Sequence, residues 1–181
     1  MVQTFTHYNN DNYNDFFSEF NFPLSDFQKA AIESIVTGNH CLVTAHTGSG
    51  KTLPAEFAIK YFKHKGKKVI YTGPIKALCN QKLYDFRNKF PEISFGILTG
   101  DIKDNPEADV LIMTTEILRN TLFNKQIIEK EDSNKISPLL SFEMDFQNEL
   151  GAVVFDEVHY ISDDDRGCLL YTSDAADEIT G

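Results

Sequence analysis

The stretch Ala45-His46-Thr47-Gly48-Ser49-Gly50-Lys51-Thr52 decides how the rest of the chain is interpreted. It follows the apolar run Cys41-Leu42-Val43-Thr44, which predicts a strand over residues 41–45. It precedes a segment in which apolar residues recur at helical spacing. A strand, a glycine-rich turn and a helix in this order point backbone N–H groups at one spot, where the helix dipole also favours an anion. This context favours a phosphate-binding loop over the alternative, a solvent-exposed turn that happens to contain a lysine.

The residues of this loop suit different parts of a bound nucleotide. Gly48 and Gly50 let the backbone curl and approach a phosphate closely. Lys51 can reach the β- and γ-phosphates, and the Thr52 hydroxyl can bind Mg²⁺. Ala45 stands where the strict pattern G-x-x-x-x-G-K-[ST] has its first glycine. We expect the nucleotide to contact His46, Thr47, Gly48, Ser49, Gly50, Lys51 and Thr52.

A pair of acids follows another apolar run much later in the chain. Asp156 and Glu157 come directly after Val153-Val154-Phe155, so they are expected at the end of a strand. A nucleotide site needs one acid to hold Mg²⁺ and another polar group to orient the attacking water. We assign the first role to Asp156 and the second to Glu157. An acidic pair alone is more often a solvated loop, but together with the glycine loop it predicts an ATP or GTP site.

Strand and helix patterns alternate along the chain, which predicts an α/β fold. Strands that are apolar on both faces and separated by helices are typical of a mainly parallel sheet with helices on both faces. In such sheets, ligands bind at the carboxyl ends of the strands. The expected strands are 41–45, 69–72, 94–98, 109–113 and 153–155. Four helices are expected: one that starts at Ser25 and ends before Gly38, one over 54–63, one from after Pro74 to about residue 90, and one over 115–123.

The domain boundaries follow from composition. Residues 1–19, rich in Asn, Asp and Tyr, are expected to form a poorly ordered tail before one domain over residues 20–167. Residues 124–149 are too long for a simple connector and are interpreted as a surface excursion that partly packs back. Residues 168–181 are interpreted as non-native, because Cys168 to Glu178 resemble the translation of an adapter used in making sequencing libraries. The alternative is a native ending with a helix start at Ser173.

The overall composition limits the classes of function. A formal net charge of −10 argues against nucleic-acid binding by bulk electrostatics, although it leaves a local strip of contacts possible. The sequence shows neither an apolar run of membrane-spanning length nor a secretory leader, so we expect no membrane association. The three cysteines lie far apart without metal-ligand spacing, which favours a reduced, intracellular setting.

Six motifs resemble the first RecA-like domain of the superfamily-two DExH-box helicases, most of all the superkiller-type RNA helicases that feed the RNA exosome. The motifs are FQKAAI, AHTGSGKT, GPIKALCNQK, LTGD, MTTEILRN and FDEVHYI, in this order over about residues 22–167. The resemblance implies a RecA-like P-loop NTPase domain that uses ATP and Mg²⁺ to drive movement along single-stranded RNA. It also implies a nuclear or cytoplasmic location, an exosome-type complex, and a second RecA-like domain with an arginine finger that is absent from this chain. Without that second domain, the chain is expected to be nearly inactive alone.

The resemblance also assigns roles to individual residues. Gln28 would read the adenine edge, whose donor and acceptor match an amide, and Phe22 or Phe27 would stack on the ring. The alternative for Gln28 is a capping box with Ser25. His159 would link the nucleotide site to the rest of the domain. A strip that holds the nucleic-acid backbone without reading its sequence would contain Pro74, Lys76, Thr99, Gly100, Asp101, Thr114, Thr115 and Arg119.

Other functions remain open at this point. A DNA-directed translocase of the same superfamily would carry the same motifs, since the contacts to the RNA 2′-hydroxyl that separate the two cannot be read from the sequence. An inactive nucleotide-binding or interaction module is compatible with the acidic charge. A P-loop kinase or transporter ATPase gives no reason for PIKAL or TTEILRN.

Overall fold

The computed structural model describes residues 7–128 and 144–158. The chain divides into two compact units, residues 1–61 and 62–181. The expected tail over 168–181, His159, and the central part of the 124–149 excursion lie outside the described residues. Within the described residues, no helix has both the length and the apolar character that a membrane span requires.

The first unit is built around helix α2, Asp26–Thr37. Its first turn has a capping box, in which the side chains of Ser25 and Gln28 each form a hydrogen bond with the backbone N–H of the other residue. The helix ends at Gly38, which adopts the left-handed conformation at φ 74°. Both ends therefore lie where the sequence predicts them. The unit also contains most of helix α3, Thr52–His64, which confirms and slightly extends the helix expected over 54–63.

The amino-terminal residues of this unit differ from the expected poorly ordered tail. Residues 11–17 form a 3-10 turn, η1 (Asp11–Tyr13), and a short helix, α1 (Asn14–Phe17). Phe16 packs edge-on against Phe57 at a centroid distance of 5.9 Å, and Phe17 and Phe20 also pack on the apolar cluster around Ile32. The aromatic side chains thus anchor a segment whose composition otherwise favours disorder, since their burial offsets the entropy of ordering it.

The strand expected over residues 41–45 is not formed. Residues 39–46 are in neither helix nor strand, and the Leu42 side chain is 74% exposed. An apolar run becomes a strand only when a neighbouring strand pairs with its backbone, and every strand of the sheet comes from residue 68 or later. The described residues of the first unit, 7–61, therefore contribute no strand to the sheet.

The second unit contains a five-stranded sheet in the order β3-β2-β4-β1-β5. The strands are β1 (Lys68–Gly73), β2 (Phe95–Leu98), β3 (Lys103–Asp104), β4 (Val110–Thr114) and β5 (Leu150–Phe155). All neighbouring strands are parallel except β3, which pairs antiparallel with β2. Four strands match the sequence prediction, whereas the two-residue β3 is too short to leave a periodic pattern.

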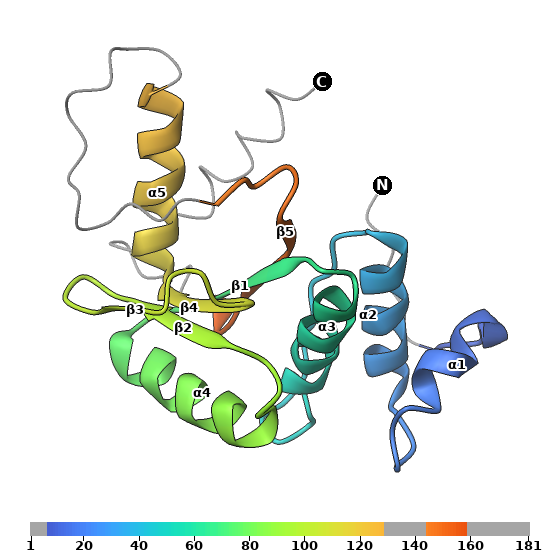
Figure 1. The fold of residues 1–181 in the computed structure, drawn as a ribbon. Coiled ribbons are helices and arrows are strands. Elements are labelled where there is room, and N and C mark those ends of the chain that lie inside the picture. The colour runs from blue at the N-terminus through green and yellow to red at the C-terminus, as the bar shows by residue number, and fades with distance from the viewer. Residues whose placement is uncertain (1–6, 129–143, 159–181) are drawn as a thin grey trace. The chain divides into compact units, whose positions relative to one another are not determined.

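Helices cover both faces of this sheet, as predicted. Figure 1 shows α4 (Lys76–Lys89) on one side and α5 (Thr115–Ile128) on the other. Neighbouring residues of β1 point to opposite faces: Ile70 lies in the cluster that contains α5 residues, while the Tyr71 ring packs edge-on against Phe86 of α4. The mainly parallel sheet with helices on both faces confirms the predicted α/β class.

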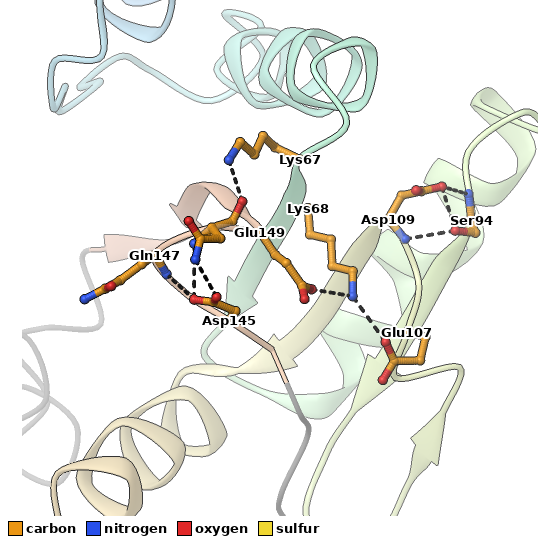
Figure 2. Close-up of polar contacts among 9 residues, drawn as sticks. Lys67, Lys68, Ser94, Glu107, Asp109, Asp145, Gln147 and Glu149 are labelled. Atoms are coloured by element: carbon orange, nitrogen blue, oxygen red, sulfur yellow. Dashed lines mark hydrogen bonds and ion pairs between the residues drawn. The ribbon is translucent and has the colours of Figure 1, made fainter. Parts of the chain in front are cut away.

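Charged side chains join the strands at the amino end of the sheet (Figure 2). Lys68 forms ion pairs with Glu107 at 3.2 Å and with Glu149 at 2.8 Å. Asp109 accepts hydrogen bonds from the Ser94 amide and hydroxyl. It also forms an ion pair with Lys63 at 2.7 Å. We call these six residues the amino-end network. Hydrogen bonding to Glu149 outweighs the opposing effect of burial and raises the pKa of Lys68.

Candidate functional site

The glycine loop has the backbone geometry expected of a phosphate cradle. Gly48 and Gly50 adopt φ values of 82° and 84°, in the left-handed region that favours glycine. Thr52 is the first residue of α3, so the loop runs directly into a helix amino terminus. The buried Ser49 hydroxyl has no hydrogen-bond partner among the described residues. A polar atom of this kind inside a curled loop fits a site that accepts a polar ligand.

Lys51 folds back over the loop. Its Nζ donates a hydrogen bond to the Ala45 carbonyl oxygen at 2.7 Å, and the side chain is exposed to solvent. The ammonium group is thus within reach of the loop interior and is held by a single neutral acceptor, which a phosphate oxygen can replace with a stronger, charge-assisted bond.

Gln28 connects the start of α2 to the glycine loop. Its Oε1 accepts a hydrogen bond from the Ser25 amide at 2.9 Å, and its Nε2 donates one to the Gly50 carbonyl oxygen at 3.2 Å. The side chain is buried, and a Cβ on Gly50 would lie only 2.6 Å from Nε2. The structure therefore shows the capping-box role, while adenine recognition by Gln28 stays a prediction. Phe22 is 53% exposed and Phe27 is half-buried.

Two hydrogen-bond donors and one ammonium group surround the Asp156 carboxylate at the end of β5. The buried Tyr71 hydroxyl donates to Oδ2 at 2.5 Å, and the Lys82 ammonium lies 3.7 Å from the same oxygen. The Glu157 amide donates to Oδ1 at 3.0 Å. Burial and the neighbouring Asp156 charge both raise the pKa of Tyr71, so it remains a hydroxyl donor at neutral pH.

Glu157 has an uncommon backbone conformation. Its φ of 57° lies in the left-handed region, which costs a non-glycine residue roughly 1–2 kcal/mol. Such strain is concentrated at functional sites, where the surrounding structure maintains it. This observation supports Glu157 as a functional residue without fixing its chemical role.

Tyr71 and Lys82 were not among the residues expected from the sequence. A signal for Tyr71 exists, because it is the one residue with a phenolic hydroxyl in the buried run Val69-Ile70-Tyr71-Thr72. A buried tyrosine hydroxyl needs a hydrogen-bond partner, and a polar group beyond a neighbouring strand end is a natural candidate. Lys82 is one of several lysines on α4, and its sequence position carries no comparable signal.

The residues predicted to hold nucleic acid gather at the carboxyl ends of three adjacent strands, β2, β4 and β1. Lys76, at the start of α4, pairs with Asp101 at 2.6 Å, and Thr99 donates to the same Asp101 oxygen at 2.8 Å. The Thr115 hydroxyl donates to the Gly73 carbonyl oxygen at 3.3 Å, which links the end of β1 to the start of α5. The structure thus brings residues from three separate motifs to one end of the sheet.

The remaining strip residues differ in their surroundings. Hydrogen bonds from Lys76 and then Thr99 lower the pKa of the exposed Asp101. Thr114 is buried, Pro74 is half-buried and Gly100 is exposed. The Arg119 guanidinium lies over the Phe123 ring at 5.5 Å, which is a cation–π contact.

The residues present are compatible with magnesium and a triphosphate. Hydroxyl and carboxylate oxygens, as in Thr52 and Asp156, are the donors that Mg²⁺ takes from proteins. The glycine loop and the orphan Ser49 hydroxyl fit the phosphate part. Thr52 belongs to the first unit and Asp156 to the second, so their convergence on one nucleotide stays a prediction.

Comparisons with known proteins agree with the motif pattern. The chain is 42% identical over 148 residues to the antiviral helicase SKI2 of Saccharomyces cerevisiae, covering 82% of this chain and 10% of that protein. It is 45% identical over 143 residues to the Superkiller complex protein 2 of Homo sapiens, covering 79% and 10%. It is 38% identical over 151 residues to the exosome RNA helicase MTR4 of Mus musculus, covering 83% and 13%.

The chain therefore spans only a small part of the length of these relatives. A family model described as DEAD/DEAH box helicase matches residues 25–176, which includes the glycine loop, the strand-end motifs and the acidic pair. With this match over most of its length, the chain belongs to the DEAD/DEAH box helicase family.

Proposed function

We propose that the chain is the nucleotide-binding motor domain of an ATP-dependent RNA helicase. The glycine loop supports this best: two left-handed glycines, an unpartnered buried hydroxyl and a lysine lead directly into α3. Family membership supplies the link from a nucleotide site to movement along nucleic acid. The names of several relatives contain RNA helicase, which favours RNA over DNA as the track.

Each half of the proposed nucleotide site has a separate task. Loop amides and Lys51 bind the phosphates, and Thr52 and Asp156 hold the magnesium ion, which supplies charge neutralisation at the phosphates when bound. Glu157 orients the attacking water, and His159 couples the site to the rest of the domain. Phe22 or Phe27 stacks on adenine, and Gln28 reads its edge.

The carboxyl end of the sheet holds the nucleic-acid backbone. The amino termini of α4 and α5 lie directly after β1 and β4, so their free amides are available to phosphates. The hydroxyls of Thr99 and Thr115 add neutral donors. Contacts of this kind need no basic surface, which reconciles nucleic-acid binding with the net charge of −10.

The wider context is also part of the proposal. Hydrolysis by the chain alone is expected to be slow, because the resemblance places an arginine finger on a second RecA-like domain, and such a residue is worth roughly 10³–10⁵-fold in turnover. An exosome-type complex is proposed because the name of one relative contains exosome, and a nuclear or cytoplasmic location is proposed from the family resemblance.

Nucleotide binding by Lys51→Ala tests the first half of the proposal. The matched control is Lys60→Ala, an exposed lysine on the same helix α3. Fluorescence titration with a labelled ATP should show binding in the wild type and the control and none in Lys51→Ala, with identical thermal melts. Equal binding by all three would rule out the assigned site.

Nucleic-acid binding tests the second half. Anisotropy titrations with labelled single-stranded RNA and DNA of the same length and sequence should show tighter binding of RNA than of DNA. A non-hydrolysable ATP analogue should increase the affinity for RNA further. A preference for DNA would favour the DNA-directed translocase. Absence of any response to either nucleic acid, with nucleotide binding intact, would favour the nucleotide-binding module.

A further inference from the structure

Packing around the ring of Tyr71 fixes its position independently of the hydrogen bond that its hydroxyl makes. The residue is 2% exposed on β1, and its ring packs edge-on against Phe86 at a centroid distance of 5.2 Å. A tyrosine ring has only two side-chain torsions, so packing on this scale fixes the position of the hydroxyl oxygen.

The register of the sheet brings this hydroxyl to Asp156. Tyr71 of β1 lies opposite Val154 of β5, and the Asp156 amide continues the ladder by donating to the Thr72 carbonyl oxygen at 3.0 Å. The hydroxyl then donates to Asp156 Oδ2, where the Lys82 ammonium of α4 also approaches. Residues from three separate elements therefore meet at one carboxylate.

We propose that Tyr71, assisted by Lys82, is a positioning residue that fixes the Asp156 carboxylate for binding the magnesium ion of the nucleotide. This inference rests on the proposed function, in which Asp156 is a magnesium ligand. An ionised carboxylate has about four lone-pair sites, and the two hydrogen bonds from the Tyr71 hydroxyl and the Glu157 amide leave room for a cation. Hydrogen bonds to a metal-binding carboxylate orient it before the metal arrives and strengthen its binding.

A purely structural role is the competing explanation, because a buried hydroxyl also needs Asp156 as an acceptor. The neighbouring Thr72 offers a matched comparison. Its hydroxyl is equally buried, lies on the same strand, and bonds the Val154 carbonyl oxygen of β5 at 3.1 Å without touching the carboxylate. Loss of either hydroxyl removes one β1–β5 hydrogen bond, but only the loss at Tyr71 alters Asp156.

Manganese binding separates the two explanations. We would titrate Mn²⁺ into the 181-residue chain saturated with a non-hydrolysable ATP analogue, following bound Mn²⁺ by electron paramagnetic resonance. Tyr71→Phe is expected to weaken Mn²⁺ binding roughly tenfold, the lower end of the effect of removing a partner of a metal ligand. Affinity for the analogue without metal is expected to stay unchanged.

Three further variants complete the experiment. Thr72→Val should leave Mn²⁺ affinity unchanged, Lys82→Met should weaken it less than Tyr71→Phe does, and Asp156→Asn should remove the binding. Thermal melts establish that each variant is folded. If Tyr71→Phe fails to fold, the Mn²⁺ affinity of Lys82→Met is the measurement that tests the proposal.

The outcomes point to different conclusions. A wild-type affinity in Tyr71→Phe, or an equal loss in Thr72→Val, would overturn the positioning role and leave the proposed function intact. If the wild type binds no Mn²⁺ that depends on both nucleotide and Asp156, the proposed function fails and the inference fails with it.

Discussion

The two ends of the parallel sheet use charged residues in different ways. At the amino end, Glu107 and Glu149 pair with Lys68. Asp109 pairs with Lys63 and accepts a hydrogen bond from the Ser94 amide. These contacts join neighbouring strands at the residues where the strands begin. At the carboxyl end, Lys76 and Asp101 pair on the surface with side-chain exposures of 52% and 63%. The acids Glu107 and Asp101 are similarly exposed, but the lysines differ, since the Lys68 side chain is 20% exposed and that of Lys76 is 52% exposed.

The difference follows from chain direction. In β1–α4 and β4–α5, the helix begins directly after the strand, so helix amino termini with free amides collect at the carboxyl end. The last turn of α4 before β2 carries Arg87 and Lys89 instead. The polarity of the parallel sheet thus places helix amino termini, which favour anions, at one end and a basic helix carboxyl terminus at the other. Three predictions examine this contrast, beginning with the largest expected effect.

Replacing a glycine with alanine should lower the stability more at the amino end of the sheet than at the carboxyl end. A Cβ on Gly151, at the start of β5, would lie 2.3 Å from the Phe62 ring and 2.9 Å from the Lys67 Cβ, while one on Gly100 at the carboxyl end meets nothing within 4 Å. Gly151→Ala is expected to destabilise the chain by about 1–3 kcal/mol because of overpacking. Gly100→Ala should change stability by less than about 0.5 kcal/mol. Urea denaturation measures both, and equal costs would contradict the contrast.

Removing a lysine should separate stability from binding. Lys68→Met is expected to cost about 1 kcal/mol or less, because its partners Glu107 and Glu149 are substantially exposed and solvent screens the pairs. Lys76→Met should leave the urea midpoint unchanged and weaken RNA binding, measured by anisotropy. If Lys68→Met weakened RNA binding as much as Lys76→Met, the amino end would not be purely structural.

Acid should weaken the amino end through Asp109. Partial burial pushes the pKa of Asp109 up, but hydrogen bonds from Lys63 and Ser94 outweigh it and leave the pKa below its ordinary value of 3.8. A lowered pKa contributes stability above the unfolded value of 3.8, and this stability is lost as pH falls through the folded pKa. Unfolding free energy measured between neutral pH and strong acid should therefore fall below pH 3.8 in the wild type, and less steeply in Asp109→Asn. Parallel curves would show that Asp109 contributes nothing.

Local signals made part of the structure predictable from the sequence. The start of α2 at Ser25 and its end before Gly38 depend on residues within one helical turn, and both were confirmed. The strand ends that carry Thr99, Thr114 and Asp156 were also predicted, because apolar runs followed by polar residues mark them directly.

Features that depend on distant partners were missed. Residues 41–45 have the composition of a strand, but the described part of the first unit contains no strand to pair with them. Strand β3 forms by pairing with β2. The bond between Tyr71 and Asp156 joins residues 85 positions apart and depends on the register of β1 with β5. Composition and spacing along the chain do not determine such a register.

The position of β1 between two paired strands has a consequence for measuring the stability of the second unit. This strand is hydrogen-bonded on both sides, to β4 and β5, and its residues from Val69 to Gly73 are buried. Backbone amides in such a position exchange with deuterium only when the whole cooperative unit opens. Deuterium uptake at β1 would therefore report the global opening of the unit and would give its folding free energy without any denaturant.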